Sequence, residues 1–495
     1  MKTKIYSALL GLAMVFGIIA CNLDPKVYSS MTDSNFPQTA DDANALLTGL
    51  YANIKNNSGG LNDSGVNGGW GWPIWCLNAS CWWGFNEATT DELYQREATD
   101  VRNFDWGSAW NTMSTYRIIK NITRATYLLG VLDKNTSIPE ADKKKMAAET
   151  KCIRAYIMFT LYDLYGPVQF DVNPDSIANI KYRARPSKEE YFGQMVKDLT
   201  EAIPDLPGVT QGTSDWGRVN KGLANMLLMK LYMNDHQWAK ALPYAQAVVN
   251  LGYKLESDYF APFTEEQSME NVWAIPSGSQ GDNEFFYYTI PSNCAYVCGM
   301  EVAPYWGVVT MPWEFYETFT ENDVRKKGIG DHYTGPDGTE YTRYGEHQGN
   351  LQWGCIVTKY MLPKERTSSG NLHQCCFRYS DVILSLAEIE NNLNGPTDKA
   401  LSYLKMVTDR AHTTNTIPAD IQESKEKFNK FLLAERGREL YFEGWRREDL
   451  IRFGEFINNA LARGKHAKEY MEIMPIPPQV ITESGGIVKN NPGYE

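Results

Sequence analysis

Acidic and basic side chains crowd together between Glu435 and Asp449, where paired carboxylates could act as a general acid and a general base. Helical spacing in this segment would place Glu439 near Glu443, and Glu443 near Arg447. Charges one turn apart on a helix are typical of ion-paired helix faces. We therefore interpret the segment as a structural charge network and assign no catalytic residue to it.

The chain carries no familiar catalytic motif. It lacks the H-E-x-x-H zinc helix, the G-x-S-x-G elbow, the phosphate-binding loop and the dinucleotide-binding glycine pattern. The cysteines show no C-x-x-C pair, and the spacing of Asp331, Asp337 and Glu340 matches no known calcium loop. We predict a protein that is not an enzyme and needs neither metal nor cofactor. A glycoside hydrolase needs only two acids and remains an alternative.

Aromatic residues are the second group with chemical potential. The chain has 14 Trp and 29 Tyr, more amphipathic rings than a core alone requires. One cluster lies in a segment rich in Gly and Asn, which predicts a long structured loop from residue 56 to 85. Its tryptophans are Trp70, Trp72, Trp75, Trp82 and Trp83. We expect two or three to pack together and one or two to offer a flat face for stacking on a sugar ring.

A second aromatic patch follows in the middle of the chain. It comprises Phe285, Phe286, Tyr287, Tyr288, Tyr296, Tyr305, Trp306 and Trp313. Asn86, Asp91 and Asn283 are candidate hydrogen-bond partners for the hydroxyl groups of a sugar bound near either patch.

The N-terminus predicts export. Lys2 and Lys4 precede an apolar run from Ala8 to Ala20, which is too short to span a bilayer and is typical of a cleaved signal peptide. The run ends in Ile18-Ile19-Ala20-Cys21, which resembles a bacterial lipobox. We predict that residues 1–20 are removed and that Cys21 is acylated, so that the protein is anchored to a membrane by lipid.

The net charge of the chain indicates which classes of partner it can bind. The formal net charge is −12, and removal of Lys2 and Lys4 with the signal makes the mature chain more acidic. A basic face for nucleic acid is not supported by that balance. For the eight cysteines other than Cys21, we expect buried thiols or one or two disulfides.

The elements that must position these residues are mostly helical. Apolar periodicity predicts helices at residues 41–54, 108–132, 140–165, 188–202, 219–233, 237–251, 378–391 and 398–411. Ser187 and Glu190 form a capping box at the start of one of them. The last four of these helices form two similar hairpins in which small residues, Ala239 and Ala400, open the second helix. Such pairs resemble tetratricopeptide repeats, although any helical hairpin can look alike.

Residues 255–377, between the hairpins, are rich in Gly, Tyr and Trp. Short strands are predicted at residues 271–275 and 355–360, with a β-hairpin at 331–343 around Pro336-Asp337-Gly338. We predict a mainly α fold, a tetratricopeptide-like scaffold of helical pairs with a loop-rich, short-strand middle insertion. Residues 21–37 would form a lipidated tether, and residues 38–495 a single domain with elaborations at about 56–100 and 255–377.

The C-terminal third carries a specific resemblance. Residues 431–450 read FLLAERGRELYFEGWRREDL, and the chain closes with Met474-Pro475-Ile476-Pro477 and Asn490-Asn491-Pro492-Gly493-Tyr494. These segments resemble the signature helix and closing pattern of the SusD/RagB family. Shorter matches lie at Arg154-Ala155-Tyr156, Leu164-Tyr165-Gly166 and Arg185-Pro186-Ser187.

The resemblance implies a surface lipoprotein of the outer membrane of Bacteroidota. Members of this family bind glycans, or in some cases peptides, without catalysis. They act as a hinged lid on a partner, a SusC-like TonB-dependent transporter. We therefore expect this protein to capture an oligosaccharide or polysaccharide and deliver it to such a transporter, with a peptide ligand as the alternative and a purely structural lid as a further one.

The resemblance also implies where ligand binds. Family members take ligand-facing aromatics from an early loop and from the middle insertion, which form a shallow arc. No local motif fixes the correspondence, so the assignment is regional. The predicted ligand-binding residues are Trp82, Trp83, Tyr287, Tyr288, Tyr305 and Trp306.

Overall fold

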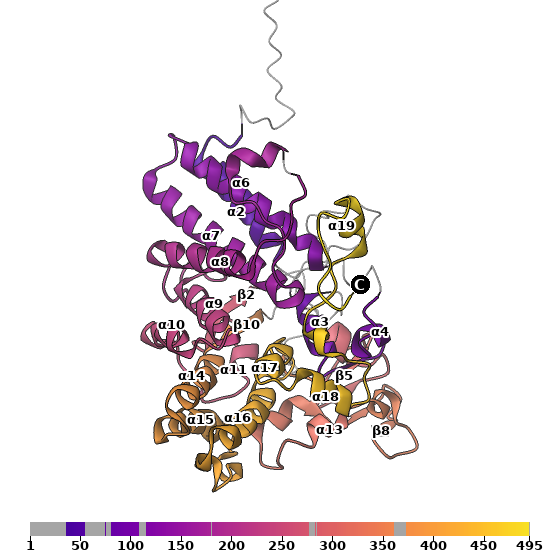
Figure 1. Cartoon of the computed structure of the whole chain (residues 1–495). Helices are drawn as coiled ribbons and strands as arrows, with labels where there is room; N and C mark the ends of the chain where they lie inside the picture. Colours follow the sequence, from indigo (N-terminus) through magenta and orange to yellow (C-terminus); the bar gives the residue numbers. More distant parts are fainter. Residues whose placement is uncertain are drawn as a thin grey trace, which may run out of the picture.

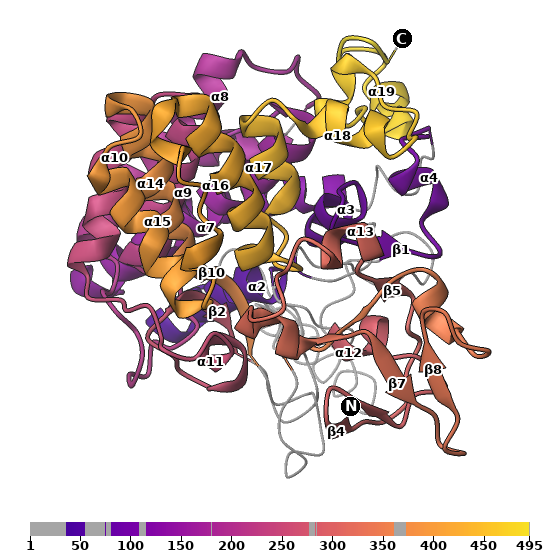
Figure 2. The ribbon, with the colours of Figure 1, turned by 90° about the horizontal axis from the view of Figure 1, so that it is seen from below.

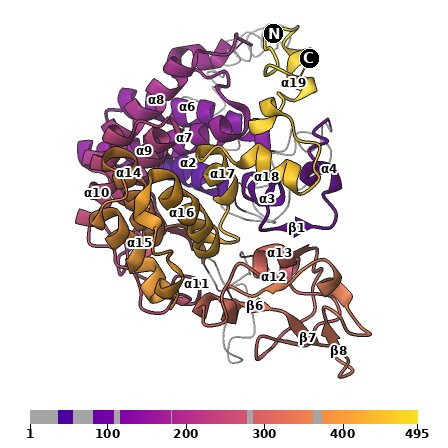
Figure 3. The same ribbon diagram turned by 60° about the horizontal axis from the view of Figure 1, so that its bottom comes forward.

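The computed structural model describes residues 36–54, 75, 81–107, 115–179, 181–276, 283, 285–360 and 373–494. Paired helices form an array along one side of the molecule, with β2 and β10 among them, and the other short strands gather on the opposite side (Figures 1 and 3). The predicted mainly α fold with a loop-rich middle region is thereby confirmed. The predicted signal peptide and nearly all of the predicted tether lie outside the described residues. No helix in the described ranges has the length and apolar character to cross a membrane.

The array begins with α2 (Ala40–Ala52), which packs against α6 (Lys120–Lys134) and α7 (Glu140–Tyr165). α7 then pairs with α8 (Lys188–Ala202). Local signals set these boundaries. α7 ends at Gly166, whose φ of 68° favours glycine. α8 begins where the Ser187 side chain accepts a hydrogen bond from the Glu190 backbone at 3.1 Å. This confirms the Ser187 half of the predicted capping box, whereas the return bond from the Ser187 amide to the Glu190 side chain is not found among the described residues.

Two helical hairpins continue the array, as predicted. The first consists of α9 (Lys221–Asn234) and α10 (Trp238–Asn250). The second consists of α14 (Tyr379–Asn394) and α15 (Asp398–Arg410), and α10 packs against α14, which joins the two. Ala400 is fully buried as expected, but Ala239 is exposed. The small residues that α10 buries are instead Ala241, two positions later, and Ala245.

The C-terminal helices close the array. α16 (Lys425–Leu440) packs on α14, and α17 (Arg446–Arg452) packs on α16. The chain then crosses through α18 (Phe456–Ala462) to α19 (Pro478–Glu483) near the C-terminus. Seen from below, α14, α15, α16 and α17 lie side by side, and β4, β5, β7 and β8 lie apart from them (Figure 2).

The strands of the described residues are short and form separate small sheets. β2 (Asn271–Ile275) pairs with β10 (Gln374–Arg378) in a buried antiparallel ribbon. β1 (Tyr94–Gln95) pairs with β5 (Val309–Thr310), and β6 (Ile329–Gly330) pairs with β9 (Ile356–Val357). A four-stranded sheet contains β3 (Tyr296–Val297), β4 (Met300–Glu301), β7 (His332–Thr334) and β8 (Glu340–Thr342). β7 and β8 are the predicted hairpin, which is confirmed.

One element contradicts the sequence prediction. Residues 82–85, expected in a loop, begin the helix α3 (Trp82–Ala88), and every residue of this helix is buried. The sequence shows no apolar stripe here because the seven buried positions include the polar residues Asn86 and Glu87 as well as aromatic rings. Burial on all sides, against α17 among others, stabilises a helix that local propensity does not favour.

Candidate ligand-binding surface

Trp82 and Trp83 lie in the core and not on a surface. Their side chains belong to residues only 1% and 3% exposed. The Trp82 indole packs edge-on against Trp75 and Trp445, with ring centroids 5.1 and 5.2 Å away. Its Nε1 donates a hydrogen bond to Asp163 at 2.6 Å. The expectation that these two rings face solvent is not met, because the fold uses them to join α3 to the helical array.

The middle patch divides differently. Trp306 is 62% exposed, Tyr287 and Tyr305 are half-buried, and Tyr288 is buried at 5% exposure. The Trp306 ring lies 5.8 Å from both Tyr287 and Tyr288, and Tyr287 lies 4.7 Å from Tyr305. We call Tyr287, Tyr288, Tyr305 and Trp306 the Trp306 cluster. In it, Tyr288 supports the exposed indole from below, while the other two tyrosines extend the surface.

The backbone of the Trp306 cluster is fixed by local contacts. The Trp306 amide donates to the Tyr287 carbonyl at 3.0 Å, which ties this segment to α12 (Phe285–Thr289). Gly307 follows with φ of 55°, and the Asn350 side chain donates to its carbonyl. A Cβ at Gly307 would meet the Pro291 Cα at 2.5 Å. The sharp turn that projects Trp306 therefore depends on a glycine at the next position.

A second aromatic surface adjoins this cluster through the β1–β5 pair. The Arg96 amide donates a hydrogen bond to the carbonyl of Val308 at 2.8 Å, and Val308 lies two residues after Trp306. The Arg96 guanidinium lies 5.4 Å from the Trp353 ring, which stacks on Tyr94 at 6.4 Å with an interplanar angle of 9°. Arg102 covers Tyr94 at 4.3 Å. Figure 3 shows α12 and β1 near one another on the strand side of the molecule.

Sequence patterns did not identify this second surface. Tyr94 and Trp353 lie far apart in the chain and meet because β1 pairs with β5, and Met311, directly after β5, bridges to Cys355. No local spacing of residue types encodes that pairing. The residues predicted to hydrogen-bond to sugar hydroxyl groups, in contrast, are buried within the protein. Asn86 is fully buried and donates to Asp163, and Asn283 is only 3% exposed.

Asp91 is also held by protein groups. Its carboxylate accepts two hydrogen bonds from Arg446, both at 2.8 Å. Burial alone would raise the pKa of Asp91, but the Arg446 guanidinium outweighs it and holds the pKa at about 2. The carboxylate therefore stays ionised and paired, and Arg446 is fixed as part of the junction between this segment and α17.

The charged C-terminal segment forms a buried network. The predicted helix stops at Leu440, and the chain reverses through Phe442, whose φ is 58°. Glu443 therefore does not pair with Arg447 as helical spacing suggested. It accepts from Arg378 Nε at 2.7 Å and from Lys359, while Arg447 donates to Asp163 at 2.9 Å. Long-range ion pairs replace the expected helix-face pairs.

Three arginines surround Glu439 at the centre of this network. Burial would raise the pKa of Glu439, but Arg410, Arg378 and Arg325 hold it at about 2. Arg378 also donates to Glu270 at 2.8 Å, and Arg325 donates to Glu435 at 2.8 Å. Because these groups are buried and already paired, the network is suited to joining segments and not to acid–base work on a ligand.

The cysteines have structural roles in the described residues. Cys81 is disulfide-bonded. Free thiols are present at Cys152, Cys294, Cys298, Cys355, Cys375 and Cys376. Burial raises the pKa of each of these thiols, so they remain protonated near neutral pH. Across the described ranges, no group of three or more His, Cys, Asp or Glu side chains is placed to hold a metal ion.

Known proteins resemble this chain in sequence and in architecture. Residues 305–494 match the sequence model of the SusD family. The chain is 24% identical to SusD-like protein P25 of Formosa agariphila, over 92% of this chain and 91% of that protein. It is 21% identical to starch-binding protein SusD of Bacteroides thetaiotaomicron, over 83% of this chain and 84% of that protein.

A solved structure shares the fold along nearly the whole chain. Surface glycan-binding protein A from Bacteroides thetaiotaomicron, in complex with laminarihexaose, superposes with a TM-score of 0.70 at 20% identity. The superposition covers 92% of this chain and 99% of that protein. The resemblance carried by the C-terminal motifs is therefore confirmed, and the chain is SusD-like in sequence and in fold.

Proposed function

We propose that this protein binds an oligosaccharide at the Trp306 cluster and releases it unchanged. The observation that carries the proposal is an indole that is 62% exposed yet held from below and from the side by tyrosines. Aromatic rings that are grouped at a surface and held in a fixed orientation are typical of a binding site, whereas a single exposed ring is not. A pyranose ring offers a flat C–H face of matching size, and stacking removes both faces from water.

The proposed site extends from Trp306 toward the second aromatic surface. Tyr287 and Tyr305 flank the indole, and Arg96 and Trp353 lie beyond the β1–β5 pair. Guanidinium N–H groups are well suited to donate to sugar hydroxyls or to a carboxylate substituent. Relatives named for binding laminarin or starch support a glycan as the ligand class. Trp82, Trp83 and Tyr288 would act indirectly, by supporting the surface.

Delivery to a transporter and anchoring in the outer membrane belong to the same proposal. The SusD-like fold supports them by analogy, with the protein as a lid above a SusC-like TonB-dependent transporter. Cys21 would carry the lipid that keeps the lid at the cell surface. Extraction of native membranes in mild detergent tests the partnership. The transporter should co-purify with this chain, and a chain that elutes alone would contradict it.

Calorimetry of the purified chain against polysaccharides, oligosaccharides and peptides tests ligand binding. Trp306→Ala should weaken binding of the preferred glycan by roughly ten- to a hundredfold, because the largest stacking face is lost. Tyr182→Ala is the matched control. Tyr182 is also partly exposed, but it hydrogen-bonds to Glu483 in α19, which lies away from α12 in Figures 2 and 3, and its replacement should leave affinity unchanged.

Three outcomes would count against the proposal. Full affinity in Trp306→Ala would place the ligand elsewhere. Binding to peptides alone would assign the protein to peptide capture. Recovery of cleaved glycan after incubation would show a hydrolase.

A further inference from the structure

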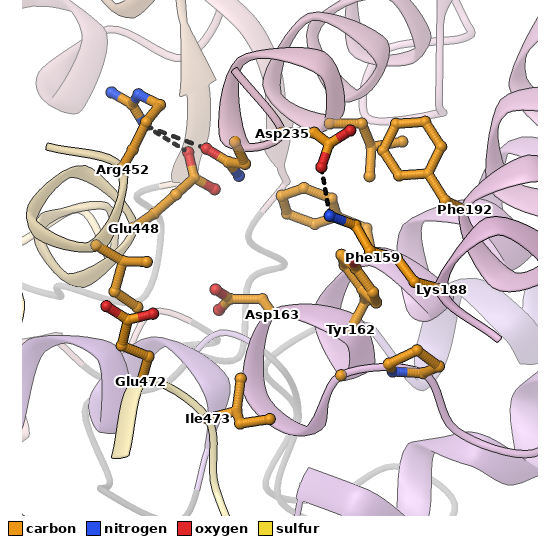
Figure 4. Close-up of a pocket in the computed structure, with 15 residues that line it drawn as sticks. Phe159, Tyr162, Asp163, Lys188, Phe192, Asp235, Glu448, Arg452, Glu472 and Ile473 are labelled. Atoms are coloured by element: carbon orange, nitrogen blue, oxygen red, sulfur yellow. Dashed lines mark hydrogen bonds and ion pairs between the residues drawn. The ribbon is translucent and has the colours of Figure 1, made fainter. Parts of the chain in front are cut away.

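A cavity separate from the aromatic surface lies where several helices of the array end. Its volume is about 290 Å³, and it lies between the C-terminal ends of α7 and α9, the start of α8, helix α17 and residues Glu472 and Ile473 (Figure 4). None of its lining residues belongs to the Trp306 cluster. A cavity of this size accommodates a small organic molecule.

Most of the cavity wall is apolar. Aromatic side chains contribute one part of it, and aliphatic side chains contribute another. These residues are Phe159, Tyr162, Phe192, Leu231, Ile451 and Ile473. Figure 4 shows Phe159, Tyr162 and Phe192 on one side of the space, facing the carboxylates of Asp163, Glu448 and Glu472 on the other. The cavity therefore joins an aromatic wall to an acidic one.

Glu448 is the buried part of the acidic wall. The residue is 3% exposed, and its Oε1 pairs with Lys230 at 2.9 Å and with Arg452 at 3.5 Å. Its Oε2 has no hydrogen-bond partner among the described residues. An unpaired buried carboxylate oxygen is costly, and such groups are normally satisfied by a donor.

Glu472 is the exposed part of the acidic wall. No ion pair or side-chain hydrogen bond is found for its carboxylate in the described part of the chain, although its backbone carbonyl accepts from Arg447. Partial burial of the carboxylate group raises the pKa of Glu472. Glu472 thus presents carboxylate oxygens to the cavity, and Glu448 Oε2, which is covered from solvent, is a second acceptor without a donor among the described residues.

The cations around the cavity are already committed. Arg452 donates to both oxygens of Glu388, at 2.7 and 2.9 Å, and to Asp449 at 2.6 Å. Lys188 pairs with Asp235 across the opposite wall (Figure 4). Asp163 is satisfied by Arg447, Trp82 and Asn86. The surplus in this cavity is therefore acceptor capacity beside aromatic faces.

We infer that the cavity binds a small organic cation, with a primary ammonium between Glu448 and Glu472 and an apolar body against Phe159 and Phe192. An ammonium supplies the donors that both carboxylates lack, and aromatic faces favour a cation further. The inference does not rest on glycan binding. The same chemistry is available from a free amine or from a lysine side chain of another protein.

Calorimetry with benzylammonium, matched against benzyl alcohol, tests the inference on the purified chain. The two probes have the same ring and differ in charge. Benzylammonium should bind roughly tenfold or more tightly than the alcohol, because charge-assisted hydrogen bonds to carboxylates are the stronger ones. N-acetyl-lysine methylamide distinguishes the sources. Binding of this probe with comparable affinity would favour a protein lysine, and exclusion of it would favour a free amine.

Variants locate the binding. Glu472→Gln should weaken benzylammonium about tenfold, and Phe192→Ala should weaken it by removing part of the aromatic wall. Glu469→Gln is the control, because Glu469 is an exposed acid one turn earlier that does not line the cavity. Glu448→Gln should abolish the preference for the cation. If that variant fails to fold, the other two still decide the question.

Two results would overturn the inference. Equal affinity for the amine and the alcohol would show an apolar cavity without charge recognition. Absence of benzylammonium binding up to millimolar concentration would show that solvent alone fills the cavity.

Discussion

At the scale of single residues, Trp83 and Trp306 show that the same type of side chain can serve either the core or the surface. Trp83 stacks on Phe285, 6.3 Å away, and is 3% exposed, whereas Trp306 projects from a glycine turn and is 62% exposed. The difference comes from the backbone on either side of each ring. Gly444, with φ of 88°, lets the C-terminal chain pass directly over the Trp83 indole.

Gly444→Ala should destabilise the protein by about 2–4 kcal/mol, because the left-handed backbone strain adds to a collision. A Cβ at this position would lie 2.1 Å from Trp83 Cδ1. Chemical unfolding measures the loss. Gly454→Ala is the matched control, since Gly454 has φ of 72° but a methyl group there would meet no neighbour within 4 Å. A similar loss in both variants would show that strain, and not packing on Trp83, dominates.

Two neighbouring acids hold the backbone beside Gly444. Glu92 accepts from the Phe442 amide at 3.0 Å, and Glu87 accepts from the Gly444 amide. Burial raises the pKa of Glu87 to about 7, and burial together with the Glu87 charge raises the pKa of Glu92 further. The pair is therefore favourable while it holds a proton and becomes a penalty as that proton leaves.

This pair predicts a pH effect with a definite sign. A carboxyl group whose folded pKa is raised costs stability as pH climbs from its unfolded value, about 4.5, through about 7. Glu92→Gln removes one titrating charge, so its stability relative to the natural chain should improve by about 1–3 kcal/mol between pH 5 and pH 8. Denaturant unfolding at both pH values measures the change. Glu97→Gln, at an exposed position, should show no such change.

At the scale of elements, the two helical hairpins differ in how they use a small residue at the start of the second helix. Ala400 is fully buried where α15 meets α14, whereas Ala239 at the corresponding place in α10 is exposed. Close packing of helices leaves no room for a larger side chain at a buried alanine. The hairpins thus resemble each other in outline and differ in which alanine forms the contact.

Ala400→Leu should lower the free energy of unfolding by about 1–3 kcal/mol through overpacking. Ala239→Leu should change it by no more than about 0.5 kcal/mol, as is usual for exposed positions. Thermal unfolding of the two variants makes the comparison. Equal effects would mean that helix propensity, and not the α14–α15 contact, sets the cost.

Element prediction from sequence succeeded where the signal was local. The bounds of α7 and β2 were predicted to the residue, since Gly166 ends the helix and Pro276 follows the strand. α3 was missed because a helix buried on all sides has no apolar stripe. The aromatic site was predicted only in part, since the sequence identifies tryptophans but does not distinguish buried rings, such as Trp82, from exposed ones, such as Trp306.

At the scale of the whole molecule, helices lie on one side and the candidate binding surface on the other (Figure 3). Residues 1–35, which carry the predicted signal and most of the tether, precede this body. Within the described residues, no helix is suited to cross a membrane. The acyl group proposed on Cys21 is the anchor that the next prediction tests.

Cys21→Ser should abolish metabolic labelling with palmitate and shift the protein from the membrane fraction to the soluble fraction. The reason is that the lipid would be attached to the sulfur atom of Cys21. Cell fractionation and labelling measure both effects. Cys298→Ser, at a partly exposed free thiol in the body, should retain label and membrane association. Retention of label in Cys21→Ser would exclude this residue as the anchor.

The buried network around Glu439 also has a consequence for folding during synthesis of the chain. Arg325, Arg378 and Arg410 all precede Glu435, Glu439 and Glu443 in the chain. Until these three acids are made, the guanidiniums have only Asp323 and Glu270 of this network as partners, and their burial is costly. Burial of the three arginines thus depends on the C-terminal segment. A truncated chain should leave residues 325–410 incompletely folded and sensitive to proteases, whereas the full-length chain should complete this part of the core in a late folding step.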